Sequence, residues 1–165
     1  MRDALAHADA LHDFAFHLTA NAAEADDLVQ ETYARALAAA ARFVAGSNVK
    51  AWLFRILHNA FVDLYRRRRD RRTDGGLDGE TDPAAGDRRQ HELEQHQARA
   101  VVGHELEEAL MSLTEEARLA VLLDLQGFTE AEMAELLGCA PGTVKSRLFR
   151  ARAALRGILK DHHER

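Results

Sequence analysis

One predicted helix near the C-terminus places chemically useful side chains opposite an apolar stripe. The stripe repeats at intervals of four, three and four residues, as on the buried side of a helix, through Val144, Leu148, Ala151 and Leu155. The opposite face offers a hydroxyl, an aromatic ring and a guanidinium with two flanking cations, namely Ser146, Phe149, Arg150, Lys145 and Arg147. Arginine bonds guanine bidentately, a hydroxyl bonds a base edge or a phosphate, and an aromatic edge meets the thymine methyl group. This set favours contact with a DNA major groove over a solvated basic helix on which Phe149 packs against a neighbour.

The residues before this face predict a helix-turn-helix. Thr129 and Glu132 have the spacing of a capping box and open a short helix, which Gly138 ends. Pro141 then stands where a new helix begins without losing a hydrogen-bond donor. Free backbone amides at the start of that second helix suit a phosphate group. Two short helices joined by a tight turn, with a polar outer face on the second, are typical of a DNA-binding unit.

The N-terminal half holds a second cationic helix. Its apolar residues step by three, one, three, one and three along Leu53, Ile56, Leu57, Ala60, Phe61 and Leu64. Six arginines between positions 66 and 72 end this helix, and they are interpreted as phosphate contacts because packing does not require so many. Aromatic residues that could stack bases lie among the cations, namely Trp52, Phe54, Phe61 and Tyr65. Phe61 also lies on the apolar stripe, and Trp52 is more readily explained as a structural residue.

Charge is arranged in blocks that the overall balance hides. The 165-residue chain has a formal net charge of −5, but residues 35–72 carry +8 and residues 137–165 carry +5. Residues 1–34 carry −6, and residues 73–136 carry −12. Two basic segments set between acidic ones predict two separate contacts with polyanions on one chain.

Composition excludes several classes of function. The single cysteine, Cys139, excludes an internal disulfide and a cysteine-based zinc site, and it suits a reducing cytosol. His7, His12 and His17 are spread around a helix, so the nine histidines are interpreted as surface residues and no metal site is assigned. No pair of carboxylates or of nucleophile and base stands out, so neither catalysis nor a cofactor is expected. No apolar run reaches the roughly 18 residues of a membrane span, and the N-terminus lacks an export signal.

Two small helical domains joined by a flexible acidic linker are the predicted architecture. Residues 73–89 hold four of the ten glycines, one of the two prolines and almost no large apolar side chain. Long stretches without these residues predict an all-α fold. The expected division is residues 1–72 for the first domain, 73–95 for the linker and 96–165 for the second domain.

Periodicity and capping residues predict the other helices. A first helix is expected from Leu5 to Thr19, and Asn21 with Glu24 has the spacing of a cap that opens the next helix. A loop is expected over residues 42–48. The apolar face of the second helix is predicted to hold Leu28, Thr32, Ala36, Leu37 and Ala40. Two helices before Gly127 are expected to bury Leu106, Leu110 and Leu113, and then Val121, Leu122 and Leu125.

Three segments resemble the extracytoplasmic-function (ECF) sigma factors, small sigma-70-type specificity subunits of bacterial RNA polymerase. They are Ala25–Tyr33 (ADDLVQETY), Asn48–Leu57 (NVKAWLFRIL) with Asn59 and Asp63 after it, and Gly138–Leu155 (GCAPGTVKSRLFRARAAL). The segments lie in the expected order, and only the linker lacks a resemblance. The resemblance implies sigma region 2 in the first domain and region 4 in the second. Such a chain binds core polymerase, recognises the −10 and −35 promoter elements and promotes initiation, with no reaction of its own.

The resemblance also implies roles for particular residues. A clamp set would dock the clamp coiled coil of core polymerase through Asp26, Asp27, Leu28, Gln30 and Glu31. A −10 set would help to open the −10 element and hold an extruded base, through Phe43, Ser47, Asn48, Lys50, Trp52, Arg55, Asn59, Arg66 and Arg67. A −35 set would contact the −35 element through Thr143, Lys145, Ser146, Arg147, Phe149 and Arg150.

The implied partners are core RNA polymerase, through its clamp and flap, promoter DNA and a cognate anti-sigma factor. The implied location is the bacterial cytoplasm, with the anti-sigma partner able to hold the chain at the membrane without insertion of its own. The linker is either a plain tether or a charged strand in the channel that nascent RNA later takes. Two other functions stay open: a stand-alone helix-turn-helix regulator that binds duplex DNA as a dimer, and a protein that sequesters polymerase without contacting DNA.

Overall fold

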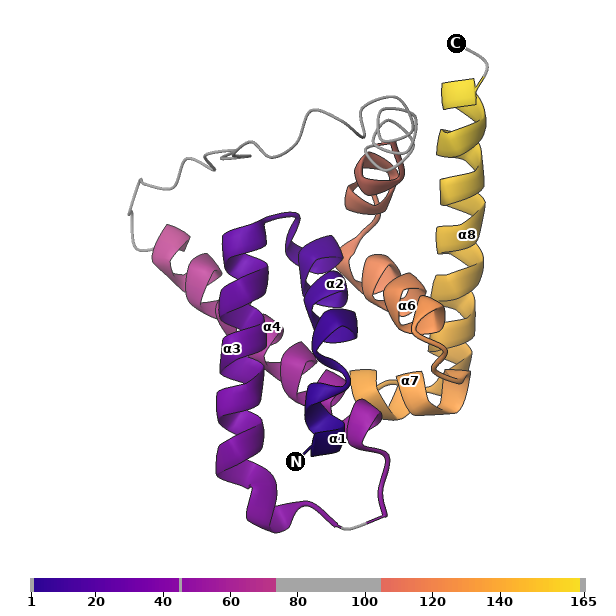
Figure 1. The fold of residues 1–165 in the computed structure, drawn as a ribbon. Helices are drawn as coiled ribbons and strands as arrows, with labels where there is room; N and C mark the ends of the chain where they lie inside the picture. Colours follow the sequence, from indigo (N-terminus) through magenta and orange to yellow (C-terminus); the bar gives the residue numbers. More distant parts are fainter. Residues whose placement is uncertain (1, 45, 74–104, 164–165) are drawn as a thin grey trace, which may run out of the picture.

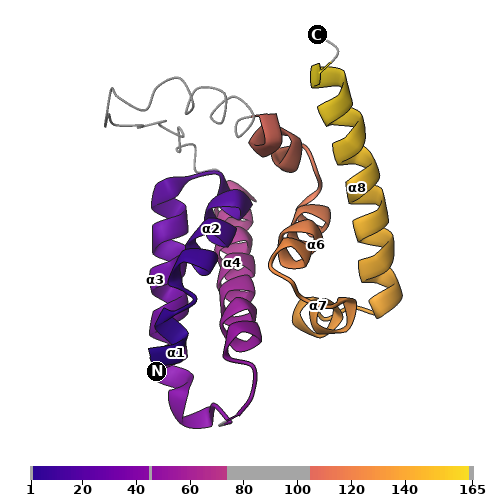
Figure 2. The same cartoon turned by 45° about the vertical axis from the view of Figure 1, so that its right-hand side comes forward.

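A computed structural model describes residues 2–44, 46–73 and 105–163, and these residues form helices and turns without any strand. The helices are α1 (Arg2–Leu5), α2 (Ala8–Thr19), α3 (Ala22–Ala39), the short 3-10 helix η1 (Ala40–Arg42), α4 (Val49–Thr73), α6 (Glu115–Leu125), α7 (Glu130–Leu137) and α8 (Pro141–His163). Residues 105–111 are also helical. Figures 1 and 2 show two groups of helices side by side, α1–α4 and α6–α8, so the all-α prediction is confirmed. Apart from Thr73, the predicted linker lies outside the described residues.

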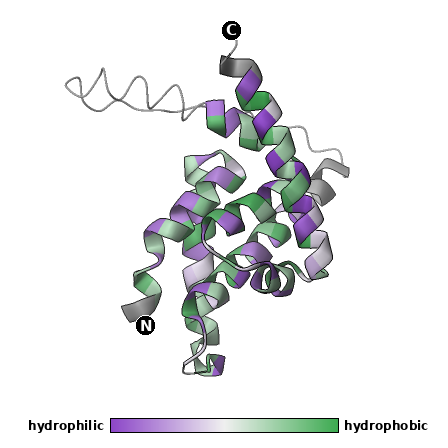
Figure 3. Ribbon diagram, turned by 90° about the vertical axis from the view of Figure 1, so that its right-hand side faces the viewer, coloured by the Kyte–Doolittle hydropathy of each residue, from purple (hydrophilic) through white to green (hydrophobic). Residues whose placement is uncertain are grey.

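Each group of helices is held by apolar side chains. Figure 3 shows hydrophobic residues concentrated where the helices meet, and hydrophilic residues along the outer turns. In the first group, the rings of Phe14 on α2 and Phe54 on α4 pack edge to face with centroids 5.0 Å apart. Fully or almost fully buried residues complete the two cores, namely Leu11, Leu18, Leu28, Leu53, Leu57 and Phe61 in the first group and Leu119, Leu123, Met133, Leu136, Val144 and Leu148 in the second. None of the helices in the described part of the chain combines the length and the apolar character that crossing a bilayer requires.

The predicted helix boundaries with capping residues are confirmed. Asn21 accepts a hydrogen bond from the Glu24 backbone N–H at 3.1 Å, which satisfies one free amide at the start of α3. Thr129 and Glu132 form both halves of the capping box at the start of α7. That helix ends at Gly138, whose φ of 63° lies in the left-handed region that glycine adopts without steric cost. These local devices fix where α7 stops and therefore where α8 begins.

The helix predicted over Leu5–Thr19 is confirmed as α2 from Ala8 to Thr19, but its predicted start is wrong, because a separate α1 ends at Leu5. The Tyr33 hydroxyl on α3 donates a hydrogen bond to the Ala4 carbonyl at 2.9 Å. In a continuous helix that carbonyl would accept the amide of Ala8 instead. A contact from a residue 29 positions away therefore accompanies a break that the local pattern does not signal.

Several apolar residues that the periodicity placed on buried faces are exposed instead. Leu37 near the end of α3 is 59% exposed, and Leu125 at the last position of α6 is 72% exposed. Leu106 and Ala40 are exposed as well. The helical period continues beyond the stretch that a neighbouring helix covers, so position on a stripe does not by itself imply burial.

The two domains pack against each other. The Phe54 ring on α4 meets the Phe128 ring before α7, with centroids 5.2 Å apart. The Arg118 guanidinium on α6 donates through Nη1 to the Leu18 carbonyl of α2 at 3.1 Å. These two contacts, one apolar and one polar, join residues that lie on opposite sides of the linker in the sequence.

Two histidines are less exposed than the surface interpretation predicts. His17 and His58 are half-buried, and the Nδ1 atom of each is buried without a hydrogen-bond partner in the described part of the chain. Burial lowers the pKa of His58 below its ordinary value near 6.5. The folded protein therefore favours the neutral form of this side chain.

The free energy of unfolding should fall as the pH drops through the range just below 6.5. There the unfolded chain protonates His58 while the folded chain does not, so acid favours unfolding. His58→Leu should reduce this slope, as measured by denaturant unfolding at several pH values. His12→Gln, which changes a histidine with an exposed ion pair, is the matched control. An unchanged slope in His58→Leu would contradict the assignment.

Candidate nucleic-acid and polymerase interfaces

The outward face of α8 presents the central members of the −35 set. Lys145, Ser146 and Arg150 are exposed, and Phe149 is 71% exposed, which excludes packing of its ring against a neighbour in this arrangement. Arg150 donates through Nε to the Ser146 carbonyl at 3.3 Å, which orients the guanidinium along the helix. Its two terminal nitrogens have no hydrogen bond or ion pair within the described residues, so they suit a base edge or a phosphate.

Other cations of α8 turn toward the protein. Arg147 is half-buried, with Nη1 3.9 Å from the Cys139 sulfur, and Thr143 is half-buried at the start of the helix. Arg152 forms an ion pair with Asp124 of α6 at 2.6 Å. A shallow groove along the outer side of α8 is lined by Lys145, Ser146, Phe149, Arg150, Arg152 and Arg156 together with Glu130 of α7. Four of these lining residues are cations and one is an anion, so the groove carries a net positive charge, as a DNA-binding surface needs to.

The −10 set begins at the loop before α4. The half-buried rings of Phe43 and Trp52 contact each other with centroids 4.8 Å apart, so each ring has a structural partner. Asn48 accepts a hydrogen bond from the Ala51 backbone N–H at 3.1 Å, which caps the start of α4. Ser47 is exposed, and its hydroxyl donates to the Val44 carbonyl at 2.6 Å. The loop conformation is thus held by its own polar groups.

Three members of the −10 set contact the second domain. Lys50 donates to the Gln126 carbonyl at the end of α6 at 2.5 Å, and its ammonium lies 5.3 Å from the Phe128 ring centroid. Arg55 forms an ion pair with Glu135 of α7 at 2.7 Å. Asn48 Nδ2 lies 3.4 Å from an oxygen of Glu132. These contacts bring together residues that are 76 to 84 positions apart.

The remaining −10 residues are spread along α4. Asn59, Arg66 and Arg67 are exposed, and Arg67 lines the groove between α3 and α4. Phe54, expected as a base-stacking candidate, is fully buried in the core, so that interpretation is wrong. It packs between Phe14 and Phe128, and an interior ring has no face free for a base.

The clamp set lines a groove between α3 and α4, with one exception. Asp27, Leu28, Gln30 and Glu31 all lie in this groove, where the buried Leu28 is part of the wall. Arg35 organises the acidic side, because its guanidinium donates to Glu31 at 2.7 Å and to Asp63 of α4 at 2.8 Å. The bond from Arg35 lowers the pKa of Asp63 below its usual range.

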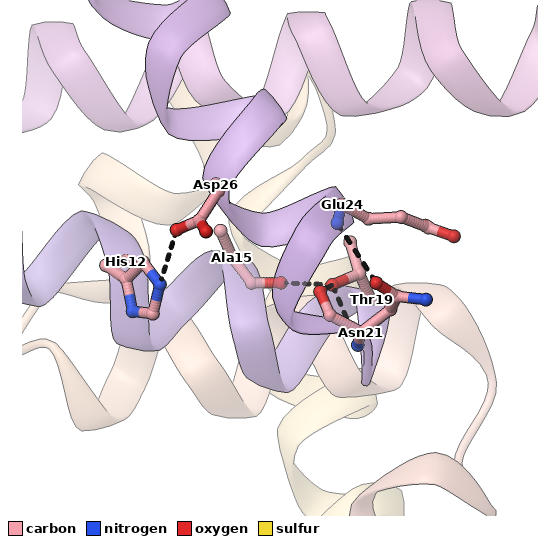
Figure 4. A network of polar contacts seen from close by, with 6 residues as sticks. All are labelled: His12, Ala15, Thr19, Asn21, Glu24 and Asp26. Carbon is pink, nitrogen blue, oxygen red and sulfur yellow. Dashed lines mark hydrogen bonds and ion pairs between the residues drawn. The ribbon is translucent and has the colours of Figure 1, made fainter. Parts of the chain in front are cut away.

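Asp26 faces a different neighbour. It lies 3.0 Å from His12 of α2, as Figure 4 shows beside the capping contacts of Thr19, Asn21 and Glu24. This contact joins α2 to α3, and Asp26 is not among the residues that line the groove. The structure thus separates one carboxylate of the clamp set from the other two.

One structurally important residue, Arg118, was missed by the sequence analysis. It is 6% exposed and donates to four carbonyls, those of Leu18, Leu110, Met111 and Leu113. Burial lowers the pKa of the guanidinium. The sequence did carry a signal for this role, because Arg118 is the only lysine or arginine in α6 and lies among apolar residues.

The two domains match two descriptions of the sigma-70 class of transcription factors. "Sigma-70 region 2" matches residues 4–71, and "Sigma-70, region 4" matches residues 103–155. The helix-turn-helix and its exposed cationic face thus lie in region 4, and the α3–α4 groove lies in region 2. The fold and its surfaces define a two-region sigma factor.

Whole-chain relatives specify the group within that class. The chain is 41% identical over 160 residues to the ECF RNA polymerase sigma factor EcfG of Rhodopseudomonas palustris, covering 95% of this chain and 83% of that protein. It is 36% identical to the ECF RNA polymerase sigma factor SigE of Mycolicibacterium smegmatis, covering 94% of this chain and 60% of that protein. The chain belongs to the ECF RNA polymerase sigma factors.

Solved structures agree with this assignment. The sigma factor RpoE in its complex with the anti-sigma factor NepR from Bartonella quintana has a TM-score of 0.74 and 34% sequence identity, covering 96% of this chain and 95% of that one. CnrH, in complex with the cytosolic domain of CnrY, has a TM-score of 0.69 and 27% identity, covering 97% of this chain and 86% of that one.

Proposed function

We propose that this chain is a dissociable subunit that binds core RNA polymerase through region 2 and directs it to promoters with −10 and −35 elements. The observation that carries the proposal is the outward set of Lys145, Ser146, Phe149 and Arg150 on the second helix of the turn. Region 2 on the same chain supplies a separate groove with acidic residues and a separate cationic helix. A stand-alone helix-turn-helix regulator has no need of region 2.

The clamp set is proposed to dock a basic helix of the polymerase clamp. Asp27 and Glu31 lie along one side of the α3–α4 groove, and Arg35 holds the Glu31 carboxylate in place. Carboxylates in a fixed arrangement favour a cationic partner and exclude an anionic one. The residues 1–72, 73–95 and 96–165 are the proposed region 2, linker and region 4.

An anti-sigma partner is proposed as the regulator of this chain. The support is the similarity to RpoE, which was solved with the anti-sigma factor NepR, across almost the whole of both chains. Because the proposed function requires core polymerase, we propose that the active protein lies in the cytoplasm. A membrane-anchored anti-sigma factor would hold the inactive protein at the membrane. The chain itself is proposed to have no catalytic activity and no cofactor.

Run-off transcription with purified core polymerase on genomic promoter fragments tests the proposal. We expect specific transcripts only when both core polymerase and this chain are present. Tight, sequence-specific binding of duplex DNA by the free chain, unaffected by polymerase, would favour the stand-alone regulator instead. Polymerase binding without promoter-specific transcripts would favour a sequestering protein.

Removing the two groove carboxylates should weaken polymerase binding. For Asp27→Asn with Glu31→Gln we expect an affinity for core polymerase about twofold to thirtyfold lower, since each exposed ion pair contributes roughly 0.2–1 kcal/mol. The difference in affinity between the wild type and this double variant should shrink as the salt concentration is raised, because screening weakens the ionic contacts of the wild type. Asp13→Asn, a carboxylate on the exposed side of α2, is the control. Equal affinities at low salt would argue against docking in this groove.

A further inference from the structure

The start of α4 is covered by region 4 in this arrangement. Lys50, Arg55 and Asn48 all contact one short stretch of region 4, from the end of α6 through α7. Figures 1 and 2 show α7 beside the beginning of α4. The covered side chains are the ones that region 2 would offer to the phosphates and bases of an opened strand.

Region 4 meets these donors with oxygen acceptors. Glu135 binds the Arg55 guanidinium at 2.7 Å, and the Gln126 carbonyl accepts from Lys50 at 2.5 Å. Glu132 is held in its capping box by Thr129 and turns its other oxygen toward Asn48. Hydrogen bonds from Thr129 lower the pKa of Glu132, which keeps this carboxylate charged. These two carboxylates and one carbonyl offer oxygen acceptors, which a nucleic-acid backbone would also present.

Contacts outside this polar patch support the same closed arrangement. Phe54 and Phe128 pack with centroids 5.2 Å apart, and the Lys50 ammonium lies 5.8 Å and 5.3 Å from the centroids of these two rings. Arg118 joins α6 to the end of α2 through the Leu18 carbonyl at 3.1 Å. Meanwhile Phe149 and Arg150 on α8 stay exposed, and the α3–α4 groove stays open to a partner.

We propose that the acidic side of α7 is an internal competitor for single-stranded nucleic acid at the start of α4. In the free chain, Glu132 binds Asn48 and Glu135 binds Arg55. The Gln126 carbonyl at the end of α6 accepts a hydrogen bond from Lys50. The strand site becomes available only when region 4 moves away, whereas the clamp groove and the −35 face are available throughout. This inference rests on the proposed function, and it orders the events: polymerase binding comes before capture of the opened strand.

The test measures binding of a fluorescein-labelled, 20-nucleotide single-stranded DNA of random sequence to the full chain. We expect Glu132→Gln with Glu135→Gln to bind this probe about threefold to tenfold more tightly than the wild type, because one competing ion pair is removed and the hydrogen bond from Asn48 loses its charged acceptor. Glutamine retains the acceptor that the capping box needs, so α7 should still form. Circular-dichroism melting curves check that both proteins are folded.

The control removes the same amount of charge elsewhere. Asp13→Asn with Glu116→Gln changes two exposed carboxylates on α2 and α6 for which no contact between the two domains is found in the described residues. We expect this variant to bind the probe within twofold of the wild type. If the two double variants bind the probe equally well, the gain comes from net charge alone and the competitor proposal is wrong. If neither differs from the wild type, it is wrong as well.

A distance measurement tests the closed state without nucleic acid. Spin labels at Asp13→Cys and Leu125→Cys, in a Cys139→Ser background, report the separation of α2 from the end of α6. We expect one narrow distance distribution in the free chain and a longer distance with core polymerase bound. A broad distribution in the free chain would overturn the closed arrangement. If run-off transcription failed, the proposed function would be wrong. The distance measured in the free chain would still test the closed arrangement.

Discussion

Arg150→Ala is expected to lower transcription from −35-dependent promoters by about fivefold to a hundredfold. The guanidinium is exposed on the outer face of α8 and anchored only through Nε to the Ser146 carbonyl, so its remaining donors suit bidentate bonding to guanine. Loss of one such contact costs about 1–3 kcal/mol. Quantitative run-off transcription with wild-type and variant chains at equal polymerase occupancy measures the effect.

Two controls separate base recognition from simple charge. Arg150→Lys keeps the charge but not the planar fork, so it should lose most of the activity if Arg150 bonds a base edge. It should retain most of the activity if Arg150 only neutralises a phosphate. On a promoter whose −35 bases are randomised, Arg150→Ala and the wild type should give equal transcription. An equal loss on both promoters would contradict base recognition by this residue.

Arg118→Met is expected to lower the free energy of unfolding by about 3–5 kcal/mol, because each buried carbonyl that loses its only donor costs about 1–3 kcal/mol. Arg118 donates to four carbonyls, two at the end of the helix over residues 105–111, one in the turn that follows and one at the end of α2. Methionine fills much of the volume but removes the donor from all four carbonyls, of which only that of Leu110 also accepts a backbone amide, from Leu113, in the described residues. Chemical denaturation followed by circular dichroism measures the loss.

Arg156→Met is the matched control for this second result. Arg156 is exposed on α8, and such surface substitutions usually change stability by less than about 0.5 kcal/mol. A similar small change for Arg118→Met would show that water or a rearranged side chain satisfies the carbonyls. Since Arg118 also binds Leu18 of region 2, its loss should also broaden the α2–α6 distance distribution.

Local sequence signals were sufficient for much of region 4. Thr129, Glu132 and Gly138 act on neighbouring backbone groups, so they set the boundaries of α7 whatever the rest of the chain does. The 3.6-residue period then separates Val144 and Leu148, which are buried, from Arg150, which is exposed. The helix-turn-helix and its outer face were predictable because each depends on residues a few positions apart.

Only the tertiary structure decided which aromatic and apolar residues are buried. Phe54 and Phe149 both lie on cationic helices, yet Phe54 is fully buried and Phe149 is 71% exposed. The difference arises because α4 has helices packed around it where Phe54 lies, whereas the outer face of α8 has none. Leu125 shows the same limit, since its place on the stripe of α6 falls beyond the reach of a covering neighbour.

By itself, the sequence therefore determined the helical fold class, the capped helix starts, the two cationic segments and the family. The tertiary structure alone decided the pairing of Arg55 with Glu135, the hydrogen bond from Arg118 to the Leu18 carbonyl and the contact of Asn48 with Glu132 on α7. The physical reason is the range of the interactions. Caps and periodicity act within one or two turns of a helix, whereas these contacts join residues 80 or more positions apart and exist only when two domains meet.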